Sequence, residues 1–278
     1  MRTNYLLAFA AVMMLLYSGC SEAYLEADNG SGKSASSMEQ ASWADSVAHY
    51  RSLAGQGDGQ AYLRLAQCYH EGKGVGKDFV MTWQMAQMAE QYGGIAHGKD
   101  FFKALPDDAP DRLLMEAMDD IGNLQREKAL LAADRLAAQA HPYADLIKGA
   151  VAMEEDRPEE ATALLRSAAS QGCLLAAMAV SVLSEGKNAL FDYAEQLPLL
   201  YCELARRSFA SDINPAEDEQ AAAYYLQADE RLCLDRTGVR WLLGYYEYQA
   251  ANGQMATSDP RLEHLRLLNS RLAPRTRK

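Results

Sequence analysis

The segment closest to a catalytic motif is GGIAHGKD, residues 93–100. Its glycines and Lys99 have the spacing of a phosphate-binding loop, in which backbone amides cradle phosphates and a following hydroxyl holds magnesium. The residue after Lys99 is Asp100 rather than Ser or Thr, and the pattern before the loop is helical rather than that of a strand. These two departures argue against a nucleotide site.

The histidines and acidic residues of the sequence lack the spacing that a metal site or an acid–base pair requires. No two histidines lie four residues apart on one helical face, and HExxH does not occur. The acid clusters at 119–120 and 154–156 are adjacent residues, whose side chains point in different directions on a helix. No serine has the surroundings of a nucleophile elbow. A hydrolase is therefore the least favoured function, and we expect no catalytic residue, metal or cofactor.

Four cysteines follow Cys20 along the chain, at spacings far too wide for a zinc ribbon: Cys68, Cys173, Cys202 and Cys233. Each lies in an apolar helical stretch, where a free cysteine acts as a small core residue. We expect all four to be free and buried. If any pair forms a disulfide, Cys202 and Cys233 are the candidates, because their helices should be neighbours.

The first nineteen residues carry one charge, Arg2, followed by the apolar run LLAFAAVMMLLY. A positive end, a short apolar segment and small residues before a cut are typical of a secretory signal rather than a membrane span. The ending Ser18-Gly19-Cys20 resembles the bacterial lipoprotein box, except that Tyr17 replaces a small aliphatic residue. The resemblance implies a lipid on Cys20, and an ordinary signal cleaved elsewhere is the alternative.

Residues 20–37 are rich in Gly, Ser and Ala and show no apolar period, which predicts a flexible tether after a signal peptide at 1–19. Ser21 follows the lipid site directly, and a serine there resembles the signal of lipoproteins sorted to the outer membrane rather than retained in the inner membrane. We therefore expect a lipid-anchored protein of the bacterial cell envelope, whose folded part faces either the periplasm or the medium.

The net charge of the chain is −11 at pH 7, although its last eight residues, RLAPRTRK, carry four basic side chains and no acid. An acidic body repels phosphate backbones, so nucleic acid is not an expected partner. The basic end is most simply solvated, with contact to anionic lipid head groups as the weaker alternative.

The segment from Gly57 to Gly93 has the pattern of two helices joined by a glycine-rich turn. Ala61, Leu65 and Tyr69 recur at helical spacing, and Asp78 can cap a second helix over 79–91. Gly72 and Gly74 allow the backbone angles that the turn HEGKGVGKD needs. A hairpin this short must stack on neighbours of its own kind to bury its apolar face.

The pattern of this hairpin resembles the Sel-one-like repeat, a relative of the tetratricopeptide repeat. Thr82 and Met85 depart from the family pattern, which has alanine and a large aromatic there. The resemblance implies an all-α, right-handed superhelical solenoid of helix–turn–helix repeats. Further helices are predicted by apolar spacing and by capping signals, over 42–57, 111–121, 124–140, 142–153, 157–172, 172–186, 199–207, 215–232, 237–251 and 258–272. We assign 38–208 to the repeat solenoid and 209–278 to a C-terminal helical cap with its basic tail.

Two sets of side chains are candidates for partner binding. The first helix of a repeat lines the concave side of such a stack, so Gln60, Arg64 and Gln67 should face solvent there. Trp241, Tyr245 and Tyr248 fall at i, i+4 and i+7 of one helix. Such a row is usually core, and it becomes an interaction patch if the last helix leaves it open.

These observations favour a lipid-anchored scaffold, adaptor or regulator that binds protein partners through a helical-repeat surface. The alternative is a surface lipoprotein that captures carbohydrate or peptide beside an outer-membrane transporter. Exposed aromatic rings forming a platform would favour capture, and a polar concave face would favour the scaffold.

Overall fold

A computed structural model describes residues 37–185, 190–198, 200–208 and 215–273. Within these ranges the chain is all-helical, without a strand, and consecutive helices pack against one another. The predicted all-α fold class of stacked helix–turn–helix pairs is confirmed. No helix in these ranges is both long and apolar enough to cross a bilayer. The predicted signal at 1–19, the lipid site Cys20, all of the tether except residue 37, and the last five residues lie outside the described ranges.

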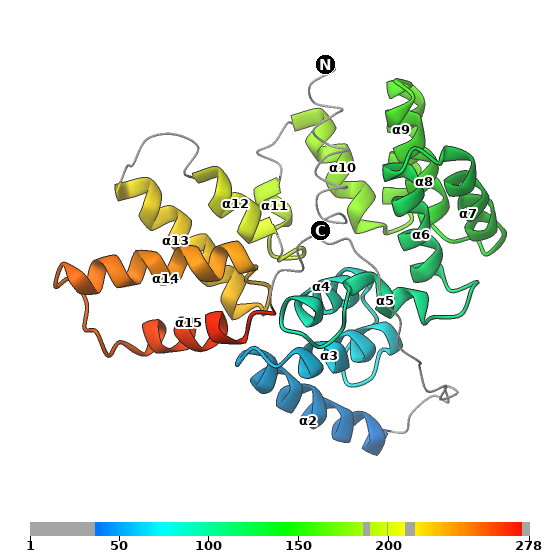
Figure 1. The fold of residues 1–278 in the computed structure, drawn as a ribbon. Helices are drawn as coiled ribbons and strands as arrows, with labels where there is room; N and C mark the ends of the chain where they lie inside the picture. The colour runs from blue at the N-terminus through cyan, green and yellow to red at the C-terminus, as the bar shows by residue number, and fades with distance from the viewer. Residues whose placement is uncertain (1–36, 186–189, 199, 209–214, 274–278) are drawn as a thin grey trace. The chain divides into compact units, whose positions relative to one another are not determined.

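The described chain divides into two compact units. The first unit, residues 102–195, consists of antiparallel helix pairs that follow one another along the chain (Figure 1). Its helices are α6 (Pro110–Gly122), α7 (Arg126–Ala138), α8 (Tyr143–Glu154), α9 (Pro158–Ser170), α10 (Leu174–Glu185) and α11 (Leu190–Tyr193). The short helix α5 (Gly98–Lys103) spans the boundary between the units.

The second unit combines the first described helices of the chain, residues 37–101, with the last, residues 196–273. Its helices are α2 (Ser37–Ala54), α3 (Gly59–Glu71), α4 (Phe79–Gln91), α12 (Leu200–Ser208), α13 (Pro215–Glu230), α14 (Arg236–Ala251) and α15 (Pro260–Arg271). The compact units therefore differ from the division at residue 208 that the sequence suggested, because α2 to α4 share a unit with the C-terminal helices.

The first repeat has the local structure that its sequence predicts. Asp58 caps α3 by accepting from the amides of Gln60 and Ala61, and Asp78 caps α4 by accepting from Met81 N at 3.0 Å. Gly74 has φ +69°, and a Cβ there would lie 2.6 Å from the backbone of Trp43. Only glycine therefore lets the turn between α3 and α4 lie against α2.

The two departures from the family pattern are both accommodated inside the first repeat. The side chains of Thr82 and Met85 are buried, and Thr82 Oγ1 donates to the carbonyl of Asp78 at 2.7 Å. A hydroxyl that bonds to the preceding turn of its own helix can be buried without an unpaired polar group. The departures therefore leave the helical hairpin intact.

Candidate interaction surfaces

The polar row predicted on α3 is present in the second unit. Gln60 and Arg64 are exposed and Gln67 is partly exposed, while Leu65 and Ala66 on the same helix are completely buried. Arg64 donates to Gln67 Oε1 at 3.0 Å, so these two side chains are neighbours. The outward side of α3 is therefore a polar face.

Gln60 also has a structural contact that its position in the repeat did not predict. Its Nε2 donates to the carbonyl of Gly94 at 2.9 Å. A Cβ on Gly94 would lie 2.1 Å from the carbonyl oxygen of Gly59, so the two backbones touch at this point. Part of the hydrogen-bonding capacity of Gln60 is therefore already used in joining the start of α3 to the end of α4.

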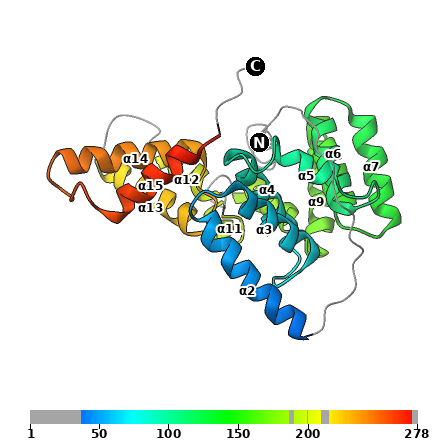
Figure 2. The same ribbon diagram turned by 60° about the horizontal axis from the view of Figure 1, so that its bottom comes forward.

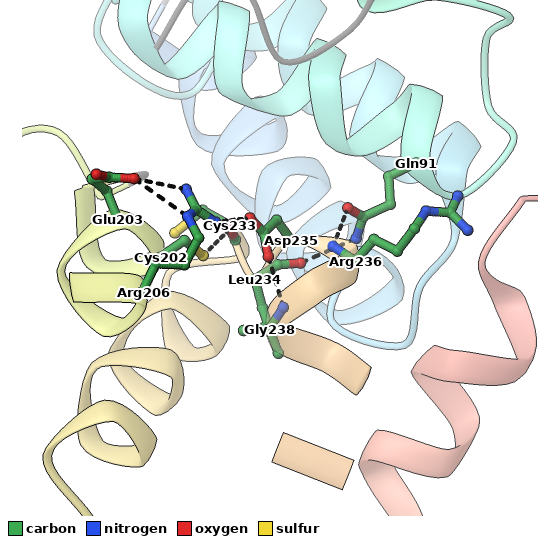
Figure 3. Close-up of polar contacts among 9 residues, drawn as sticks. All are labelled: Gln91, Cys202, Glu203, Arg206, Cys233, Leu234, Asp235, Arg236 and Gly238. Carbon is green, nitrogen blue, oxygen red and sulfur yellow. Dashed lines mark hydrogen bonds and ion pairs between the residues drawn. The ribbon is translucent and has the colours of Figure 1, made fainter. Parts of the chain in front are cut away.

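The first turn of α14 is fixed by a capping aspartate. Asp235 accepts from Gly238 N at 2.7 Å, and its other carboxylate oxygen pairs with Arg206 of α12, as Figure 3 shows. A carboxylate at a helix N-terminus satisfies a free amide and complements the helix dipole. Asp235 therefore sets the start of α14 and joins it to α12.

The same end of α14 is held to α4 by one side chain (Figure 3). The amide of Gln91 donates through Nε2 to the carbonyl of Leu234 at 3.0 Å and accepts through Oε1 from Arg236 N at 2.7 Å. The side-chain amide of Gln91 thus donates one hydrogen bond to the backbone and accepts one from it, as the backbone of a neighbouring β-strand would. Sequence reasoning missed this contact, because the partners are more than 140 residues apart.

The aromatic row of α14 is partly buried on the side of α13. Trp241 stacks on Tyr245 with ring centroids 5.2 Å apart and an interplanar angle of 12°, and it leans against Tyr225, 5.5 Å away. Tyr225 is fully buried, whereas Trp241 and Tyr245 are partly exposed. Tyr248 is 68% exposed. The final helix therefore leaves the row partly open.

Helix α15 also packs along α14, as Figure 2 shows. The guanidinium of Arg261 lies 5.1 Å from the ring centroid of Tyr246, which is buried beneath it. His264 is also tied to α13, through a 3.0 Å contact between its Nε2 and Asp229 Oδ2. This hydrogen bond raises the pKa of His264 above its ordinary value.

Away from its contacts with α13 and α15, α14 presents an outer face that no other described helix covers. Its exposed members, spaced along one side of the helix, are Thr237, Arg240, Gly244, Glu247, Tyr248 and Ala251. A Cβ built at Gly244 meets no atom within 4 Å, so the middle of this face is open. Among these residues the sequence predicted a role in partner binding for Tyr248 alone, although the seven-residue spacing of Thr237, Gly244 and Ala251 is visible in the sequence.

The four described cysteines are free and buried, as predicted. Cys202 Sγ lies 3.4 Å from the carbonyl oxygen of Cys233, whose own Sγ donates to the carbonyl of Ala228 at 3.1 Å. Burial raises the pKa of both thiols, which favours their neutral form. The alternative Cys202–Cys233 disulfide is not formed in this structure.

The loop at 93–100 is occupied by a side chain of its own repeat. Glu90 accepts from Gly98 N at 2.6 Å, and its second oxygen lies 3.5 Å from Nδ1 of the buried His97. An anion would have to displace this carboxylate to reach the Gly98 amide. Within the described ranges, no group of three or more His, Cys, Asp or Glu side chains is placed to hold a metal ion.

Comparisons of the chain with protein-family models, with curated proteins and with solved structures find no match. The similarity to the Sel-one-like repeat consequently stands on the spacing of residues 57–93 and on the helical hairpin that they form.

Proposed function

We propose that this protein is a non-catalytic adaptor of the bacterial cell envelope, anchored by a lipid on Cys20, which binds a protein partner through the outer face of α14. The outer face comprises the six exposed residues named above together with the adjacent, partly exposed Trp241. The polar row of α3 is the second surface available to such an adaptor.

The observation that carries the proposal is the partial exposure of the aromatic row. Tyr248 is 68% exposed, and Trp241 and Tyr245 reach the surface beside it. Trp, Tyr and Arg dominate the energetic centres of protein interfaces, because they bury large areas and also form hydrogen bonds. Arg240 is exposed on the same face. A row of this composition supports recognition of a protein.

Capture of carbohydrate is the second candidate, and the exposed ring of Tyr248 is the observation that favours it. A sugar platform requires open ring faces. Trp241 and Tyr245 instead lie almost parallel and stacked, so each covers a face of the other. The geometry therefore supports a protein partner better than a sugar.

The proposal is tested by affinity enrichment of the full chain from crosslinked envelopes. The test variants are Tyr248→Ala and Trp241→Ser, and the matched control is Leu131→Ala, which removes an equally exposed apolar side chain from α7. Loss of a hot-spot side chain weakens binding by about 2 kcal/mol or more, roughly thirtyfold.

We expect a stoichiometric protein partner with the unaltered chain and with Leu131→Ala, and its loss with both α14 variants. Recovery of glycan without protein would move the assignment to the second candidate. Equal recovery from all variants would contradict the role of α14. Labelled fatty acid should be incorporated by the unaltered chain and not by Cys20→Ser.

A further inference from the structure

We propose that the occupant of the outer face of α14 is the same face of a second copy of this chain, packed antiparallel about a two-fold axis beside Gly244. This inference rests on the proposed function, because it names the partner of the same surface. It follows from a self-complementary order of residues along α14.

The middle of the face consists of small residues at seven-residue intervals, Thr237, Gly244 and Ala251, and all three are exposed. In an antiparallel pair centred on Gly244, each Gly244 lies opposite its equivalent, and each Thr237 lies opposite the Ala251 of the other copy. Small residues at all these crossing points let two helices approach within the usual range of roughly 8–10 Å.

Charges of opposite sign lie on one side of this small-residue row. Arg240 and Glu247 are four and three residues from Gly244 in opposite directions, so the two-fold axis brings the Arg240 of each copy to the Glu247 of the other. Arg240 is exposed and has no ion pair within the described ranges. The contact between Glu247 and Arg266, at 3.5 Å between half-exposed side chains, is weak and easily exchanged.

Aromatic rings lie on the other side of the row. Trp241 and Tyr248 are three and four residues from Gly244 in opposite directions, and the same axis places each Trp241 beside the Tyr248 of the other copy. Tyr248, which is 68% exposed, would thereby gain an aromatic neighbour in the dimer.

The symmetry of the pairs is the reason for choosing a second copy over an unrelated protein. A two-fold interface uses the same patch on both subunits, so every residue must find a complementary residue of that patch. Here small residues meet small residues, a cation meets an anion and a ring meets a ring. An unrelated partner would impose no such relation between positions on either side of Gly244.

A cysteine at the axis tests this arrangement directly in the full chain. Gly244→Cys places two thiols next to each other in the dimer, and within a single copy a Cβ built at Gly244 meets no atom within 4 Å. A short bis-maleimide should then link two copies. Ser270→Cys, on an exposed position of α15, is the matched control, and the unaltered chain measures the background from Cys20 and the buried cysteines.

Charge exchange supplies the decisive comparison. In the Gly244→Cys background, Arg240→Glu or Glu247→Arg alone should lower the crosslinked fraction at least about fivefold, because each change creates like-charge contacts across the axis. The double variant should restore crosslinking to within about twofold of the parent, as paired substitutions do for residues in contact.

Absence of crosslinking at residue 244, or equal loss in the single and double charge variants, would overturn the second copy as occupant. If the chain then still recovers a different protein that is lost with Tyr248→Ala, only the dimer has failed. If no variant of α14 affects any partner, the proposed function fails as well.

Discussion

Two glycines, Gly59 and Gly94, show how a single atom decides the packing of the first repeat. A Cβ on Gly94 would lie 2.1 Å from the carbonyl oxygen of Gly59, and one on Gly59 would lie 2.4 Å from Gly94 N. Both obstacles are backbone atoms, which cannot rotate away. The ends of α3 and α4 therefore meet only if both residues lack a side chain.

Gly94→Ala should lower the free energy of unfolding by about 1–3 kcal/mol, the usual cost of forcing a methyl group into packed backbone. Gly76→Ala, in the exposed turn of the same repeat, is the matched control, since a Cβ built there meets no atom within 4 Å. Urea unfolding of both variants checks this. A Gly94→Ala variant as stable as the unaltered chain would show that the two backbones do not touch.

Several helix ends lie beyond prediction from residue type. Leu124, Ala140, Asp156 and Leu232 have φ between +51° and +60°, a region in which glycine or asparagine is expected. At Gly72 and Gly93, by contrast, the glycine marked the end of the helix correctly, with φ of +73° and +77°. Where packing rather than residue preference sets the turn, the sequence carries no local signal for it.

At the scale of elements, the attachment of α14 depends on Gln91. Its amide group bonds to the carbonyl of Leu234 and to the backbone amide of Arg236, and its own backbone carbonyl accepts from Ala273 N at 2.9 Å. Helical periodicity predicted α4 and α14 to within one residue. It could not predict this contact, since amphipathic spacing states that a face is buried and not which distant helix covers it.

Gln91→Met should destabilise the second unit by about 1–3 kcal/mol, because it keeps the volume of the side chain and leaves two partly buried backbone groups without a partner. Amides at the start of α14 should also exchange hydrogen faster. Gln91→Glu retains the acceptor for Arg236 N and should be less damaging. Equal exchange in both variants would contradict the role assigned to the amide group.

The contact between α15 and α13 should depend on pH through His264. Its hydrogen bond to Asp229 raises its folded-state pKa above the ordinary 6.5, so the pair contributes fully below that pH. The contribution is lost as the pH rises through the folded-state pKa. His264→Gln should therefore lower the melting temperature more at pH 5 than at pH 8.5. A difference that is the same at both pH values would contradict the ion pair.

At the scale of the whole molecule, the repeat pattern predicted the fold class and nearly every long helix, because each hairpin carries its own capping and apolar spacing. It did not predict that residues 37–101 would form one compact unit with residues 196–273. Repeat patterns encode contacts between neighbours in sequence. A contact between the two ends of the chain depends on surfaces for which periodicity gives no partner.

The candidate surface was predictable in part for the same reason. The row Trp241, Tyr245 and Tyr248 was visible as spacing, but whether it was core or surface depended on how much of it α15 covered. The structure leaves Tyr248 exposed and stacks Trp241 on Tyr245, so one end of the row lies on the surface and the other end is partly buried. The sequence alone did not indicate that Arg240, Gly244 and Glu247 lie together on the exposed outer face of α14.

The central claim, that the outer face of α14 contacts a protein, is tested most directly by photo-crosslinking in intact cells. A photoreactive amino acid would replace Tyr248 in the full chain, with Leu131 as the matched exposed position on α7. We predict one discrete protein product from position 248, of twice the mass of the chain, and none from position 131. Absence of any product from position 248, or the same products from both positions, would contradict the claim.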